Sequence, residues 1–176
     1  MYLKTLAIVL VFLAVIGCQK ATPVNTPSSS PQKEVQTAIE TFLAHIHAGR
    51  ADEAFAMTAY SKDIPQWDLD NNKDIIYRFS EGAAQGNWHY TLLDVHVEGI
   101  GAVGLMNEDI KEGRSTFDID PIYLARLDNQ WRIILDITKY EHALPLLSPQ
   151  DYAVYESLEQ WYETRKEEVI QTHKSY

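Results

Sequence analysis

The hydrophobic period of the chain changes from that of a helix to that of a strand near residue 87, and this change constrains the fold more than any other feature. From residue 33 onward apolar residues such as Val35, Ile39 and Ile46 recur at helical spacing and form one stripe. In residues 87–98 apolar side chains alternate with polar ones, as in a strand with one buried face. Helices followed by consecutive strands indicate the α+β class.

Three helices are predicted before the period changes, at residues 33–49, 51–59 and 73–84. Residues 60–72 between them are polar and contain Pro65, so we expect a loop there. Four strands are predicted after the change, at residues 87–98, 100–107, 117–127 and 131–137. Their short connections indicate an antiparallel meander.

Two residue types predict irregularities in these strands. Pro121 cannot donate to a sheet ladder, so its strand is expected to be bulged or to lie at an edge. Gly101 and Gly104 are expected where the backbone bends or bulges. A last helix is predicted at residues 150–172, with the aromatic residues Tyr155 and Tyr162 near one side. Packing of this side on the body is favoured over binding to a partner protein.

The N-terminus carries a secretion signal. The apolar run from Leu6 to Ile16 follows Lys4 and is too short to span a bilayer, which takes roughly 20 residues. The sequence Val15-Ile16-Gly17-Cys18 resembles the lipobox of bacterial lipoproteins. This resemblance implies cleavage between Gly17 and Cys18 and attachment of a diacylglycerol to the sulfur, so residues 1–17 are the expected signal peptide. The alternative is an ordinary thiol beyond a conventional cleavage site.

Residues 18–32 are rich in proline and serine and are predicted to form a flexible linker. The expected protein is therefore anchored to the bilayer through Cys18 and exposed outside the cytoplasm. Gln19 follows the cysteine where an aspartate would retain a lipoprotein in the inner membrane of enteric bacteria. The periplasmic face of the outer membrane is favoured if the cell is Gram-negative.

Two sequence motifs resemble the nuclear-transport-factor-two-like, or ketosteroid-isomerase-like, domain with its cystatin-like fold. They are FLAHIHAGRADEAFAMT at residues 42–58 and DNQWRI at residues 128–133. For residues 33–148 the resemblance implies a curved antiparallel sheet wrapped around the first helix as a cone, with a cavity at its wide end. The helix in residues 149–176 is then an addition. Such cavities hold isomerases, dehydratases, ligand-binding sites or nothing, so the fold does not decide the function.

Composition and motifs exclude several classes of function. The net charge of −10, with no basic block, argues against nucleic acid binding, and a single cysteine excludes a disulfide framework and a cysteine-based zinc site. No HExxH, phosphate-loop or GxSxG motif occurs, so neither a metal nor a cofactor is expected. His45 and His47 point to different sides of a helix. Asp68 and Asp70 lie in a calcium-loop-like stretch that lacks the required glycine and glutamate.

Asp94, His96 and Asp136 are the candidates for acid–base chemistry. Asp94 and His96 share one face of a predicted strand, and Asp136 shares a face of the last strand with Arg132. If those faces point into the cone, the three side chains suit proton transfer. If they point to water, the residues are ordinary solvated positions. The second interpretation is favoured, because four apolar residues on the opposite faces resemble core: Leu93, Val95, Ile133 and Leu135.

The sequence thus predicts a lipid-anchored binding or accessory domain at the cell envelope with an unassigned ligand, for which a small apolar molecule is one candidate. Trp67 and Trp88 are candidates to line its pocket. No catalytic residue of the resembled family can be placed on this chain, so an enzyme is the less favoured class. An isomerase or hydrolyase that uses a cavity acid or base remains one alternative. A homodimeric structural component that pairs through the outer face of the sheet, or that binds an envelope protein, remains another.

Overall fold

The structure is a computed structural model that describes residues 30–110, 118–134 and 148–174. Its elements follow the order two helices, a short strand, a helix, four strands and a last helix. They are α1 (Pro31–His47), α2 (Ala51–Ala56), β1 (Thr58–Ala59), α3 (Gln66–Ala84), β2 (Trp88–Glu98), β3 (Gly101–Ile110), β4 (Asp118–Leu127), β5 (Gln130–Ile134), the 3₁₀ turn η2 (Pro149–Asp151) and α4 (Tyr152–Lys174). The residues of the predicted signal peptide, Cys18 and Asp136 lie outside the described residues.

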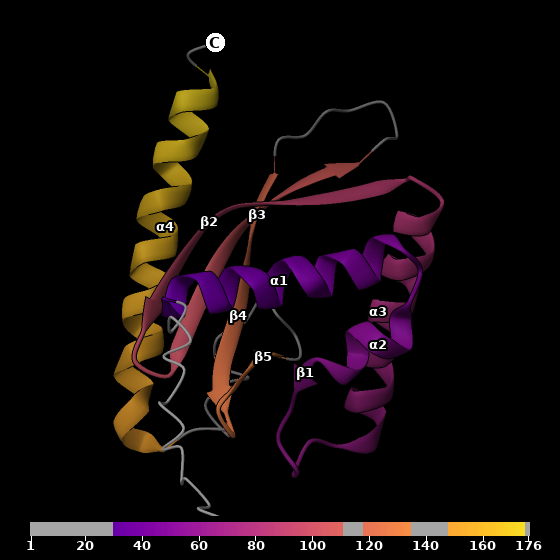
Figure 1. Cartoon of the computed structure of the whole chain (residues 1–176), viewed down its shortest axis with the longest axis horizontal. Helices are drawn as coiled ribbons and strands as arrows, with labels where there is room; N and C mark the ends of the chain where they lie inside the picture. The colour runs from indigo at the N-terminus through magenta and orange to yellow at the C-terminus, as the bar shows by residue number, and fades with distance from the viewer. Residues whose placement is uncertain (1–29, 111–117, 135–147, 175–176) are drawn as a thin grey trace, which may run out of the picture.

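One mixed sheet organises the domain. Its five strands lie in the order β1-β5-β4-β3-β2, and β2 to β5 form the expected antiparallel meander. α1 crosses one face of this sheet, with α2 and α3 beside it, and α4 lies along the other face (Figure 1). The predicted α+β class, with N-terminal helices on the sheet and an additional C-terminal helix, is confirmed. None of the helices in the described ranges is long and apolar enough to cross a bilayer.

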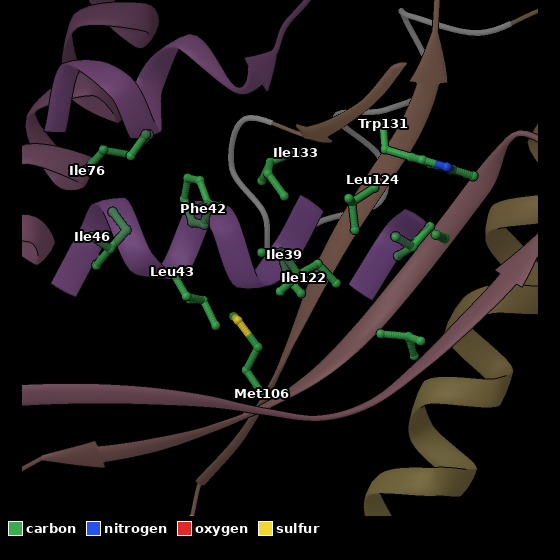
Figure 2. Packing of buried hydrophobic residues seen from close by; sticks show 14 of the residues in the cluster. Ile39, Phe42, Leu43, Ile46, Ile76, Met106, Ile122, Leu124, Trp131 and Ile133 are labelled. Carbon is green, nitrogen blue, oxygen red and sulfur yellow. The ribbon is translucent and has the colours of Figure 1, made fainter. Parts of the chain in front are cut away.

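The apolar stripe of α1 forms the core on its face of the sheet. The helix begins at Pro31. Ser30 caps its N-terminus, because the Ser30 hydroxyl accepts a hydrogen bond from the Lys33 amide at 3.3 Å. Figure 2 shows Ile39, Phe42 and Leu43 pointing from α1 toward the sheet. The side chains predicted to face inward are buried, because the helical period places them on one side.

The α4 helix packs on the opposite face, as the sequence predicted. Tyr155, Leu158 and Tyr162 are buried there. The Tyr155 hydroxyl donates a hydrogen bond to the Leu124 carbonyl at 2.7 Å, and the Tyr162 hydroxyl donates to the Ile119 carbonyl at 2.8 Å. Each buried hydroxyl therefore has a hydrogen-bond partner, so these tyrosines can be part of the core without an unpaired polar group.

Two of the sequence predictions about helices are wrong. α3 begins at Gln66 rather than at residue 73, because Pro65 stands just before the first turn, where a missing amide proton costs nothing. Asp68 and Asp70 consequently lie in a helix and not in a loop. The second helix ends at Ala56, and Thr58–Ala59 form a short strand parallel to β5. That strand pairing is non-local, so helical spacing alone does not reveal it.

The glycines of β3 do not bend the strand as expected. Gly101 and Gly104 continue its register with β2 and β4, and they provide room for helices on the two faces. A β-carbon at Gly104 would lie 2.8 Å from Ile39 Cδ1 of α1, and one at Gly101 would lie 2.9 Å from Leu158 Cδ1 of α4. The expectation of a bulged or edge strand at Pro121 is wrong: β4 lies between β3 and β5 in the sheet, and Pro121 pairs with Leu105 without a shift in register.

Gly104→Ala is expected to lower the free energy of unfolding by about 1–3 kcal/mol, because the added methyl group overpacks the contact with α1. Ile39→Val removes the Cδ1 atom nearest to that methyl group. The double variant should therefore lose less stability than the sum of the two single losses, as measured by urea unfolding. Additive losses, within about 0.3 kcal/mol, would show that the close approach at Gly104 is not the cause.

Candidate functional site

A cavity of about 300 Å³ lies between α1, α3 and the strands β2, β3 and β4. Its walls are mostly apolar, and its polar groups come from four strands and from α3. The apolar lining consists of Phe42, Leu43, Ile46, Ile75, Ile76, Phe79, Met106 and Pro121. The polar lining consists of Thr58, Asn72, Tyr90, Glu108 and Asp120.

Strand register brings the polar lining of the sheet together. Tyr90 of β2 lies opposite Glu108 of β3, and Asp120 of β4 lies opposite Met106, two residues before Glu108. The three side chains therefore share the sheet face that α1 covers. The Tyr90 hydroxyl donates a hydrogen bond to Glu108 Oε1 at 2.7 Å.

The polar end of the cavity is acidic. Burial raises the pKa of the Asp120 carboxyl, and the neighbouring carboxylates of Asp118 and Glu108 raise it further, while Lys166 opposes them. Burial, followed by the hydrogen bond to Glu108, raises the pKa of the Tyr90 hydroxyl, so this group stays protonated. The cavity thus combines apolar walls with one acid whose pKa is raised and one phenol that is a hydrogen-bond donor.

Asp94 and His96 do not line this cavity. Both face α4: the Arg165 guanidinium contacts the Asp94 carboxylate at 2.9 Å, and the His96 ring stacks on Trp161 with 5.0 Å between centroids. They are therefore neither inside the cone nor fully solvated. The third candidate, Asp136, lies outside the described residues, whereas Arg132 donates a hydrogen bond to the Ala56 carbonyl at 2.9 Å.

A β-bulge explains which residues of β2 face the core. The register shifts between Leu92 and Asp94, so Leu92 joins Val95 in the core on the α1 side. The prediction of Leu93 as core is wrong, because the residue at the bulge is 41% exposed. Val95 and Ile133 are buried as predicted, and Leu135 lies outside the described residues.

The remaining candidates occupy other positions. Trp67 is 70% exposed. Trp88 packs on Phe79 with 4.8 Å between ring centroids, and it lines a second hollow together with His47 and His89. His47 stacks on His89 at 4.6 Å, and its Nε2 accepts a hydrogen bond from the Tyr90 amide at 3.1 Å. Among the residues that the structure describes, no three histidine, aspartate, glutamate or cysteine side chains are arranged to hold a metal ion.

Sequence reasoning missed three polar residues of the cavity, Tyr90, Glu108 and Asp120. Glu108 was assigned to a turn, because the second strand was predicted to end at residue 107, whereas β3 continues to Ile110. Asp120 carries a detectable signal, since it lies in phase with Ile122 and Leu124 and is the polar continuation of their buried face. Tyr90 carries no such signal. The bulge after Leu92 shifts the alternation of inward and outward residues, so the pattern in the rest of β2 does not predict that Tyr90 faces inward.

No protein-family model matches the chain, and no curated protein matches it. Among solved structures it is similar to a putative NTF2-like transpeptidase from Campylobacter jejuni, with a TM-score of 0.45 and 13% identity over 57% of this chain and 97% of that one. It is also similar to an NTF2-like protein with a cystatin-like fold from Novosphingobium aromaticivorans, with a TM-score of 0.35 and 14% identity over 66% of this chain and 88% of that one. These likenesses concern the fold alone.

The contact between His47 and β2 predicts a loss of stability in acid. Burial, and then the neighbouring His89, lower the pKa of His47 below its ordinary value of 6.5. The unfolded chain therefore takes up a proton more readily than the folded one, and stability falls as the pH decreases from 6.5 toward the lower folded pKa. Urea unfolding between pH 7.5 and pH 5 should show that fall.

The variant His47→Gln retains a hydrogen-bond acceptor for the Tyr90 amide but does not titrate. It should therefore lose less stability in acid than the unaltered chain does. His96→Gln, on the other face of the sheet, is the matched control and should leave the contribution of His47 in place. An unchanged pH dependence in His47→Gln would contradict the assignment.

Proposed function

We propose that this chain is a bacterial lipoprotein that binds a small, largely apolar molecule outside the cytoplasm. The observation that carries the binding function is the cavity, with apolar walls from α1 and α3 and polar groups concentrated on the sheet. Small-molecule sites combine these two features, because apolar contact supplies affinity and a few polar groups fix the orientation.

The proposed anchor is a diacylglycerol on Cys18, supported by the lipobox-like residues 15–18 and the apolar run before them. The linker in residues 18–32 would join the domain at the start of α1, whereas Phe42, Leu43 and Ile46 of the cavity lie in its second half. A helix rises about 1.5 Å per residue, so Phe42 is roughly 16 Å along the axis from Pro31. This separation would leave the cavity clear of the point of attachment.

Cys18→Ser should abolish labelling of the protein by a fatty-acid probe and release it from membranes into the soluble fraction. The substitution removes the sulfur that would carry the lipid. The apolar run from Leu6 to Ile16 is too short to span the bilayer in its place. Labelling is measured by metabolic incorporation of an alkyne fatty acid. Labelling that persists in Cys18→Ser would refute the proposed anchor.

Binding in the cavity is tested with 2-phenylethanol, a neutral molecule with a ring for the apolar walls. Calorimetric titration of the whole chain in phosphatidylcholine nanodiscs, corrected with empty nanodiscs, should show saturable binding. Leu43→Trp should weaken that binding at least about tenfold, because the larger side chain fills the cavity. Leu93→Trp makes the same substitution at an exposed position outside the cavity and should leave binding unchanged.

A second candidate function is acid–base catalysis, such as isomerisation or hydration, in the same cavity. The specific observation in its favour is the raised pKa of Asp120 close to the hydrogen-bonded pair of Tyr90 and Glu108. Asp120→Asn should then abolish turnover of a neutral substrate while its binding persists. The alternative of a homodimer that pairs through the outer face of the sheet is less favoured, since α4 covers that face in the described residues.

A further inference from the structure

We infer that the ligand of this cavity is an amine, with an apolar body between α1 and α3 and an ammonium group held by the carboxylates of Glu108 and Asp120. This inference rests on the proposed function, because it specifies what that same cavity binds. It follows from the inventory of hydrogen-bond donors and charges around the cavity.

The donors that line the cavity are already engaged with the protein. The Tyr90 hydroxyl donates to Glu108, and the Thr58 hydroxyl donates to the Phe55 carbonyl at 2.8 Å. The Asn72 side-chain amide donates to the Asp68 carbonyl at 3.0 Å, which leaves one amide proton. A carboxylate has about four lone-pair sites, so Glu108 retains acceptor capacity after it accepts the hydrogen bond from the Tyr90 hydroxyl. A polar group that enters the cavity must therefore mainly supply donors.

The charges lead to the same conclusion. No lysine, arginine or histidine is among the described residues that line the cavity, whereas two carboxylates are, and Asp118 lies near them. Lys166, whose charge lowers the pKa of Asp120, does not line the cavity; it lies on α4 and donates to the Tyr162 hydroxyl at 3.1 Å. Among the described residues that line the cavity, these carboxylates therefore have no counterion, and an ammonium group would supply one.

The walls define the rest of the ligand. Phe42 and Phe79 offer ring faces and edges, and Ile46 and Met106 add flexible apolar surface. A volume of about 300 Å³ is at the lower end of small-molecule sites, which suits a body the size of one substituted ring. A carboxylate ligand of the same size would meet two carboxylates and few free donors, so the cavity should reject it.

Three ligands with matched bodies test the inference: 2-phenylethylamine, 2-phenylethanol and phenylacetate, which are a cation, a neutral molecule and an anion at pH 7.5. Calorimetric titration of the whole chain in phosphatidylcholine nanodiscs should show that the amine binds at least about tenfold more tightly than the alcohol. Phenylacetate should bind at least about tenfold more weakly than the alcohol. Leu43→Trp should weaken binding of the amine, which places the site in the cavity.

Glu108→Gln keeps an acceptor for the Tyr90 hydroxyl but removes the charge. It should weaken binding of the amine about tenfold and leave binding of the alcohol within about twofold. Glu40→Gln is the matched control, since it makes the same change on the exposed side of α1 and should affect neither ligand. Circular dichroism of each variant verifies that it folds.

The outcomes separate this inference from the proposed function. If the alcohol binds in a manner sensitive to Leu43→Trp but the amine binds no more tightly, the cavity is a binding site and the inferred preference for amines is wrong. If Glu108→Gln weakens both ligands equally, the carboxylate does not recognise a charge and the inference also fails. If none of the three ligands binds, the proposed function fails together with it.

Discussion

The close packing of α1 on the sheet at Gly104 is the contact on which the rest of the domain depends. Because Gly104 has no side chain, Ile39 of α1 and Ile122 of β4 fill the space above β3 (Figure 2). This contact fixes the height of the helix over the sheet near its middle. Further along α1, Phe42 and Ile46 face α3 and the ends of the strands, and the space between these elements is the cavity.

The other face of the sheet is covered by α4, which packs through a different set of contacts. Gly101 lets α4 approach β3, and buried tyrosine hydroxyls on α4 satisfy carbonyl groups of β4. Asp94 and His96 belong to this interface through Arg165 and Trp161, so their polarity serves packing of the helix rather than chemistry in the cavity. The α4 helix thus covers the face of the sheet opposite α1.

The cavity retains charges that do not favour folding. A carboxyl group whose pKa is raised in the folded state binds its proton more tightly there, so ionisation of Asp120 lowers stability as the pH rises through its titration. Burial and the neighbouring carboxylates are the causes. Such a group at the end of an apolar cavity is typical of a site maintained for function at some expense of stability.

The sequence alone determined the class of the fold, the inner faces of α1 and α4, and the boundary between helical and sheet regions, because hydrophobic periods of 3.6 and 2 are local properties. It also contains the lipobox-like signal, which needs no fold. The composition of the cavity was decided only in the tertiary structure. Tyr90, Glu108 and Asp120 come from three strands, and their meeting depends on strand register, on the bulge after Leu92 and on the full length of β3. Register and bulges are set by contacts between distant segments, which no local pattern contains.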